Sequence, residues 1–325
     1  MMKELIEDKT ITVKIGIDAG NSFTNVVSQD CYYDVFSSCV TENFGGEKED
    51  GINTLEIDNH HYTIGQGNLT AENTNRRDLA KYEALVVFGV CRNLEQNKID
   101  TEKVTVEIHL GIGLPLGAYS QHKETYSNLF KNKVIHCNYQ GKSIKFLISE
   151  VRVVPQATVV AYLNKELFSN IQVGYLIDWG SFTVDVQTIR GGEIVKNEKK
   201  SYDLGTLKML TELGERIKNY GGSFVDLKDI ERVLMDGEFD TEENGVVKLK
   251  EKDDLYTLIK TKVNNTVSRI KMENPQIRNS RKTVVIGGGA IVFKEILEEN
   301  LLNCTILDDA EKLNAKAYYE FVGGR

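Results

Sequence analysis

A regular alternation of apolar and polar positions near the start of the chain predicts a β-hairpin. Over residues 11–17 every second residue is isoleucine or valine, the period expected of a strand, and the apolar pattern stops at Asp18. The pattern of a second strand begins at Phe23. Between the two strands, residues 18–22 contain one carboxylate, one glycine and two small polar side chains. The sequence therefore predicts a hairpin with a short polar turn.

The residues of this turn have the chemistry of an anion site. Gly20 lets backbone N–H groups approach an anion closely, and Asn21 and Ser22 can donate hydrogen bonds to it. Asp18, at the end of the strand, suits a hydrated Mg²⁺ better than a bare phosphate. Taken alone, the stretch is explained better by an ordinary hairpin that contains an Asx turn.

The same order of residues returns 160 positions later, within residues 174–186. An apolar strand there leads to Asp178, and Gly180, Ser181 and Thr183 follow before a second alternating strand. The two copies of the motif are separated by about half the chain, and the sequence contains no repeat of short period. This spacing indicates two related halves and not an array of short repeats. We expect each half to contribute one phosphate-binding hairpin to a shared cleft.

A third element combines a strand, three glycines and a helix. Residues 283–286 are mainly β-branched, the glycines are Gly287, Gly288 and Gly289, and a helical pattern follows over 291–299. Backbone without Cβ atoms can lie against a flat ring or a phosphate. The element is neither a P-loop nor a dinucleotide fingerprint, because both of those motifs require a different glycine spacing. A tight strand-to-helix turn that binds no ligand remains the alternative for this stretch alone.

In this order, the three elements resemble the nucleotide motifs of the actin-like ATPase superfamily, which includes actins, bacterial actin homologues, sugar kinases and heat-shock chaperones. Residues 15–26 resemble the first phosphate motif, 174–186 the second and 283–290 the adenosine motif. The segments 154–162 and 314–321 are similar to the two helices that connect the halves in this family. The resemblance therefore spans nearly the whole chain.

Two shorter stretches are most similar to the bacterial plasmid-segregation actins, the ParM/StbA group. They are Gly-Leu-Pro-Leu-Gly at 113–117 and Asp-Leu-Gly-Thr at 203–206. Gln156 departs from this group, in which a glutamate is common at the corresponding position. Glutamine is not a strong base, although it can orient a water molecule by hydrogen bonding. Hydrolysis is therefore expected, and its rate is left open.

The resemblance implies an α/β chain with the actin-like, ribonuclease H-like fold, in which each half is a mixed sheet with helices and a nucleotide binds in the cleft between the halves. The first half is expected over residues 1–165, with a smaller subdomain inserted at about 30–72. The second is expected over 166–325, with an insert at about 206–280. A C-terminal helix at about 309–322 is expected to pack back toward the first half.

The resemblance also implies residue roles. The expected catalytic residues are Gln156, which would orient the attacking water, and Asp18 and Asp178, which would hold Mg²⁺ partly through water. The residues expected to hold phosphates are Gly20, Asn21, Ser22, Gly180, Ser181 and Thr183. The residues expected to meet the adenosine are Gly287, Gly288, Gly289, Glu215 and Lys218. For Glu215 and Lys218, an ordinary solvated helix face is the alternative.

Composition limits the classes of function. With 48 acidic and 40 basic residues the formal charge is −8, which argues against direct binding to nucleic acid. The five cysteines are scattered and form no Cys-x-x-Cys motif, as is typical of a reducing, cytoplasmic compartment. No apolar run approaches the ~18 residues that a membrane span requires, so no membrane partner is expected.

The expected function is an ATPase that polymerises with Mg²⁺ and ATP, with GTP as the alternative nucleotide. Its filament would drive plasmid DNA segregation through a DNA-binding adaptor protein at a centromere-like site, so its partners are further copies of itself and that adaptor. The alternative is a sugar-type small-molecule kinase of the same fold, although no catalytic carboxylate stands out beyond the hairpin aspartates. A chaperone is disfavoured because chaperones of this fold carry a large C-terminal substrate domain, and none is apparent before Arg325.

Overall fold

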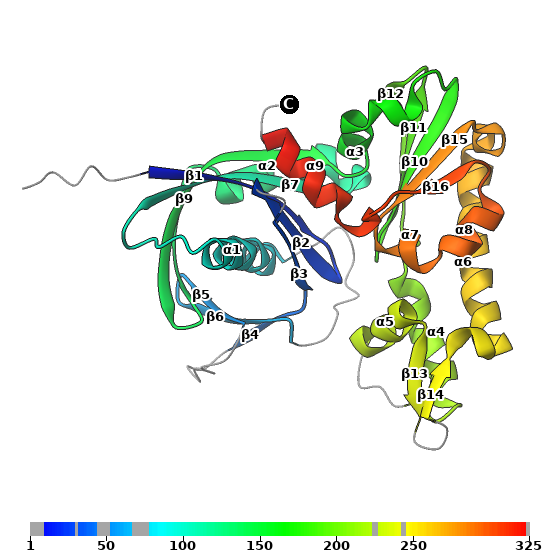
Figure 1. Ribbon diagram of the computed structural model, residues 1–325, viewed down its shortest axis with the longest axis horizontal. Helices are drawn as coiled ribbons and strands as arrows, with labels where there is room; N and C mark the ends of the chain where they lie inside the picture. Colours follow the sequence, from blue (N-terminus) through cyan, green and yellow to red (C-terminus); the bar gives the residue numbers. More distant parts are fainter. Residues whose placement is uncertain are drawn as a thin grey trace, which may run out of the picture.

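The computed structural model describes residues 10–29, 32–43, 53–66, 78–222, 227–241 and 245–322. These residues form two halves, each organised around one β-sheet with helices packed on it (Figure 1). This arrangement confirms the expected α/β fold. No helix in the described ranges is long and apolar enough to cross a membrane.

The sheet of the first half curls around one helix, α1 (Leu79–Gln96), which Figure 1 shows enclosed by strands. The order of its strands is β3-β2-β1-β7-β9-β8-β5-β6-β4. Their bounds are β1 (Thr10–Ala19), β2 (Phe23–Ser28), β3 (Tyr33–Ser37), β4 (Val40–Asn43), β5 (Thr54–Ile57), β6 (His60–Ile64), β7 (Thr105–Leu114), β8 (Lys133–Tyr139) and β9 (Lys142–Pro155). The central strands β1, β7 and β9 run parallel, and the end of β1 is buried on both faces, as parallel strands usually are. Asp78 starts α1, because its carboxylate accepts hydrogen bonds from the amides of Ala80 and Lys81.

The second half has a five-stranded sheet and a separate helical part. The sheet contains β10 (Val173–Trp179), β11 (Val184–Arg190), β12 (Glu193–Tyr202), β15 (Lys282–Ile286) and β16 (Cys304–Ile306), in the order β12-β11-β10-β15-β16. The outer part consists of α4 (Leu207–Lys218), α5 (Leu227–Asp236), the hairpin β13 (Glu238–Thr241) and β14 (Gly245–Lys248), and α6 (Asp253–Glu273). The remaining helices of the chain are α2 (Leu116–Phe130), α3 (Thr158–Leu163), α7 (Gly288–Val292), α8 (Lys294–Asn300) and α9 (Leu313–Val322).

The last helix of the chain, α9, packs against β1 and β7 of the first half and lies between the two halves in Figure 1. Glycines on the sheet permit this close approach. A Cβ atom at Gly16 would lie less than 3.0 Å from main-chain atoms of α9, and one at Gly111 would meet the carbonyl carbon of Tyr318 at 2.8 Å. At Gly113 an added Cβ would overlap the Tyr318 ring. The sheet therefore accepts the helix only because these side chains are missing.

Polar contacts also join the two halves next to the helix α3. The buried carboxylate of Asp185, on β11, accepts a hydrogen bond from the amide of Leu116 at the start of α2 (3.2 Å). The hydroxyl of Thr158 contacts the amide oxygen of Gln187 at 2.8 Å. Because β11 belongs to the second half and both partners belong to the first, these bonds fix the halves to each other at this end of the molecule.

Two of the predicted segments have a different form in the structure. The helix expected over 154–162 begins only at Thr158, because β9 continues through Pro155 and a turn at Gln156 and Ala157 follows. Part of the insert expected at about 30–72 lies outside the described residues, namely 30–31, 44–52 and 67–72. Its described strands extend the first sheet, because β5 pairs with β8.

Candidate functional site

The first hairpin turns where the sequence predicts it. Strands β1 and β2 pair in antiparallel fashion up to Ala19 and Thr24, so Gly20, Asn21 and Ser22 form the turn. Asp18 is the last residue but one of β1 and is 9 % exposed. The carboxylate of Asp18 therefore stands at the end of a strand that is buried on both faces.

The second hairpin repeats this arrangement in the other half. Strands β10 and β11 pair up to Trp179 and Val184, and the amide of Gly180 closes the turn with a hydrogen bond of 2.9 Å to the carbonyl of Thr183. Asp178 is again the last residue but one of its strand. The two aspartates therefore occupy equivalent positions in the two hairpins.

The glycine element forms the third side of the site. Strand β15 ends at Ile286, Gly287 turns the chain with φ at 89°, and α7 begins at Gly288. A positive φ of this size favours glycine over residues with a side chain. A Cβ atom at Gly288 would meet nothing within 4 Å, so the backbone there borders open space.

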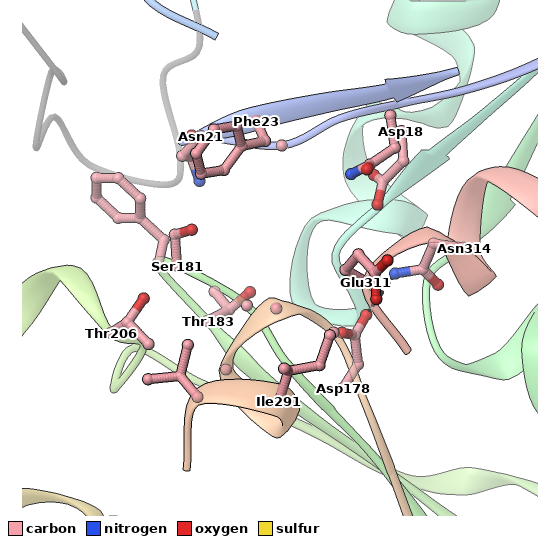
Figure 2. A pocket seen from close by; sticks show the side chains of 18 of the residues that line it. Asp18, Asn21, Phe23, Asp178, Ser181, Thr183, Thr206, Ile291, Glu311 and Asn314 are labelled. Carbon is pink, nitrogen blue, oxygen red and sulfur yellow. Dashed lines mark hydrogen bonds between the residues drawn. The ribbon is translucent and has the colours of Figure 1, made fainter. Parts of the chain in front are cut away.

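All three elements border one cavity of about 530 Å³, a size typical of small-molecule sites. Figure 2 shows Asp18 and Asn21 on one side of this cavity and Asp178, Ser181 and Thr183 on the other. The residues predicted for the site that line it are Asp18, Gly20, Asn21, Gln156, Asp178, Gly180, Ser181, Thr183, Gly287, Gly288 and Gly289. The structure thus brings together residues that lie far apart in the sequence.

Three predicted residues do not line the cavity. Ser22 is 2 % exposed, and its hydroxyl lies near Glu231 without a hydrogen bond of good geometry. Glu215 and Lys218 are exposed on α4 and lie outside the cavity. The apolar face of α4 packs into the core of the second half, so its charged residues point to solvent. For these two residues the structure matches the alternative of a solvated helix face.

The cavity is strongly acidic. Among the described residues that line it, Asp18, Asp178, Glu231 and Glu311 carry carboxyl groups, and none is lysine, arginine or histidine. Burial raises the pKa of Asp178 to about 7; a hydrogen bond from Asn314 opposes this shift, and the charges of Asp185 and Asp18 add to it. Burial also raises the pKa of Glu231 to about 6. The site would therefore gain from a bound cation.

Two side-chain amides contact the two aspartates. The Nε2 of Gln156 donates a hydrogen bond of 3.1 Å to Oδ1 of Asp18, and the Nδ2 of Asn314 donates one of 2.7 Å to Oδ2 of Asp178. Gln156 follows β9 of the first half, whereas Asn314 lies on α9. Each hairpin aspartate is thus oriented by an amide from a distant part of the chain.

Several residues of the site were not predicted. Leu234 and Met235 of α5, and Ile291 and Val292 of α7, give one part of the cavity an apolar lining. Glu231 could have been found from its spacing, because it lies on the same helix face as Leu227 and Leu234 and places a carboxyl group within an apolar stripe. For Asn314 the sequence contains no comparable signal.

The residues present fit a Mg²⁺-bound nucleotide. Asp18 and Asp178 supply the oxygen ligands that Mg²⁺ prefers, and a bound cation would offset the negative charge of the acidic lining. Ser181 and Thr183 line the cavity, and their hydroxyls can donate hydrogen bonds to phosphate oxygens. The open backbone at Gly288 leaves room for a flat ring.

Comparison with known proteins agrees with this geometry. Residues 16–158 match the family model for the N-terminal domain of actin-like proteins. None of the curated proteins matches the sequence. Among solved structures, the archaeal actin homologue Ta0583 superposes with a TM-score of 0.77 at 21% identity, covering 96% of this chain and 100% of that one.

Two further structures have the same fold. The complex of Ta0583 with ADP gives a TM-score of 0.73 at 22% identity, covering 96% of this chain and 100% of the other. A 15-stranded ParM filament from Clostridium botulinum gives 0.72 at 18% identity, covering 98% and 100%. Residues 16–158 thus resemble the N-terminal domain of actin-like proteins in sequence, and the chain as a whole has the fold of these actin homologues.

Proposed function

We propose that this protein binds a nucleoside triphosphate with Mg²⁺ in the cavity, hydrolyses it and assembles into filaments. The observation that carries the proposal is the pair of equivalent hairpins, one from each half, whose aspartates border the same cavity. A ligand that contacts both hairpins would hold the halves together. Its binding would therefore favour one relative position of the halves, and with it one assembling shape.

The roles of the residues follow from their chemistry. Asp18 and Asp178 hold Mg²⁺, partly through water, while the backbone amides and hydroxyls of the two hairpin turns hold the phosphates. When bound, Mg²⁺ offsets the negative charge of the phosphates in this acidic cavity. Gln156 orients the attacking water by hydrogen bonding, since its amide cannot act as a strong base.

The base of the nucleotide occupies the part of the cavity that Leu234, Met235, Ile291 and Val292 line. A flat ring gains by contact with apolar side chains, and the backbone of Gly287–Gly289 lets it approach closely. This assignment replaces Glu215 and Lys218 with residues of α5 and α7. ATP is the nucleotide we propose, with GTP as the alternative that the same cavity admits.

We further propose that the filament acts in the cytoplasm and moves plasmid DNA through a DNA-binding adaptor. The ParM filament supports self-assembly of a chain with this fold, and the ADP complex of Ta0583 supports a nucleotide in the cleft. The formal charge of −8 favours a separate adaptor, because an acidic chain repels DNA phosphates. The proposed domains are residues 1–165 and 166–325, with the cavity between them.

The experiment measures phosphate release and sedimentation of the purified protein with Mg²⁺ and either ATP or GTP. We expect pelleted filaments, visible by electron microscopy, only with nucleotide and above a critical concentration. The matched control is the same sample with the metal chelated. Protein that stays monomeric at all concentrations while it phosphorylates a sugar would refute the proposal and favour the kinase of the same fold.

A further inference from the structure

Asn314 connects two parts of the site that belong to different halves. Its Nδ2 donates to Asp178 on β10, and its Oδ1 accepts a hydrogen bond of 3.4 Å from the amide of Ala157, directly after Gln156. The residue is 6 % exposed and lies in the first turn of α9. An amide side chain can donate from its nitrogen and accept at its oxygen at the same time.

The turn that Asn314 contacts is strained. Ala157 has φ at 57° and ψ at −52°, and the amide of Thr158 donates to the carbonyl of Gln156 at 2.5 Å. This is the γ-turn with positive φ, which is rare and costly for a residue with a side chain, at about 1–3 kcal/mol. Such a turn persists only where its surroundings hold it. The bond from Ala157 to Asn314 is one such restraint on the turn that directly follows Gln156.

The helix that carries Asn314 is itself held firmly. Its Tyr318, one turn later on the same face, is fully buried against Gly113, and the close contact between α9 and Gly16 leaves no room for the helix to slide. Burial, followed by the charges of Asp18 and Asp178, raises the pKa of Tyr318. Asn314 projects from α9 to the border of the cavity, between Asp18 and Asp178 in Figure 2.

We propose that Asn314 is a positioning residue that sets the place of Gln156 relative to Asp178. It acts on Gln156 through the turn at Ala157, and its bond to the Asp178 carboxylate fixes the orientation of its own amide. This inference rests on the proposed nucleotide hydrolysis. Substitution of a residue that orients another in this way typically costs about 10- to 100-fold in activity.

The test compares Asn314→Ala and Asn314→Asp with wild type in single-turnover phosphate release at saturating Mg²⁺ and ATP. Asn314→Asp keeps the shape and an acceptor for the Ala157 amide but loses the donor to Asp178, so it guards against misfolding of the alanine variant. The matched control is Asn93→Ala, because Asn93 is also buried and its Nδ2 donates a hydrogen bond of 2.7 Å to the Ser28 hydroxyl, outside the site. We expect both Asn314 variants to slow phosphate release by about 10- to 100-fold, and Asn93→Ala to leave it unchanged.

A double-mutant cycle with Gln156→Ala separates positioning from a general structural role. If Asn314 acts by placing Gln156, Asn314→Ala should slow the Gln156→Ala enzyme by less than about twofold, the limit of ordinary additivity. A second readout needs no nucleotide. In protein labelled with ¹⁵N-glutamine, the side-chain amide signal of Gln156, assigned by its loss in Gln156→Ala, should shift in Asn314→Ala and stay in place in Asn93→Ala.

The outcomes divide cleanly. The role of Asn314 would be overturned if Asn314→Ala released phosphate at the wild-type rate. It would also be overturned if Asn314→Ala slowed the Gln156→Ala enzyme by the same factor as it slows wild type, or if the amide signal of Gln156 did not shift in Asn314→Ala. Parallel losses of rate and melting temperature in both the Asn314 and Asn93 variants would assign Asn314 a structural role only and also overturn it. Wild-type protein that releases no phosphate at all would instead refute the proposed function, and the Gln156 signal would still test the contact.

Discussion

Gly16→Ala should destabilise the protein, because the added methyl group has no space beneath α9. The new Cβ would lie less than 3.0 Å from the carbonyl oxygen of Ala315 and the amide nitrogen of Tyr319, and 2.9 Å from the Cβ of Tyr319. Two of these neighbours are main-chain atoms, so no side-chain rotation can relieve the overlap. The helix must shift, and overpacking of this kind costs up to about 3 kcal/mol.

Part of this loss is recovered. Alanine in a strand interior is favoured over glycine by up to about 1 kcal/mol, because glycine loses more backbone freedom on folding. The net expectation is a loss of about 2 kcal/mol, which corresponds to a fall of about 3 °C in melting temperature, because the unfolding entropy of about 2.1 cal/mol/K per residue is large for a chain of this length.

Urea unfolding followed by circular dichroism measures this loss. The matched control is Gly288→Ala, the same substitution at a position where an added Cβ meets nothing within 4 Å. We expect the control to unfold at the wild-type urea concentration but to bind nucleotide more weakly, since its methyl group enters the cavity. Wild-type stability of Gly16→Ala would show that α9 yields freely, and would refute the view that glycines set its position.

Four further outcomes are expected. Asp18→Ala and Asp178→Ala should each weaken Mg²⁺-dependent nucleotide binding in calorimetry while the melting temperature stays near that of wild type; wild-type affinity in both would remove the cavity as the nucleotide site. Gln156→Ala should keep binding and assembly but slow phosphate release about 100-fold, for a barrier increase of ~2–4 kcal/mol, and so give longer-lived filaments; unchanged release would exclude Gln156 from the mechanism. Assembly followed by light scattering should begin only above a critical concentration and only with nucleotide and Mg²⁺. Asp185→Asn should stabilise the protein above pH 6, because burial raises the pKa of Asp185 from 3.8 to about 6 and wild type loses stability as pH rises through that value. The gain, about 3 kcal/mol at pH 8, should vanish near pH 4 in urea unfolding, and exposed Asp236→Asn should show none; a gain at both pH values would contradict the burial argument.

Local patterns made the hairpins and the glycine element predictable. Each is a strand followed by a turn, and a turn's residue types are set by its own backbone, as Gly287 illustrates with its positive φ. The repeated aspartate at the end of a strand then indicated that two such turns share one site. These features are determined by residues that are neighbours in the sequence, so they can be recognised from one sequence alone.

The rest of the site depends on contacts between distant segments. Asn314 meets Asp178 across 136 positions, and Gln156 meets Asp18 across 138. Neither contact changes the periodicity or the composition of the sequence around the residues that form it, so neither could be predicted from those patterns. The exposure of Glu215 depends on which face of α4 packs on the sheet, and the pattern of α4 alone was compatible with a role at the cavity. Tertiary packing, and not local propensity, decided each of these cases.

The packing of α9 on the first sheet also has a consequence for synthesis. Residues 10–155 emerge from the ribosome early, yet the helix that packs on β1 and β7 around Gly16 and Gly111 is formed by residues 313–322. At about 5–20 residues per second, the intervening stretch takes on the order of 10–30 s to translate. During that interval the glycine surface of the nascent first half, with its main chain at Gly16 and Gly111, lacks the helix that packs on it in the folded protein.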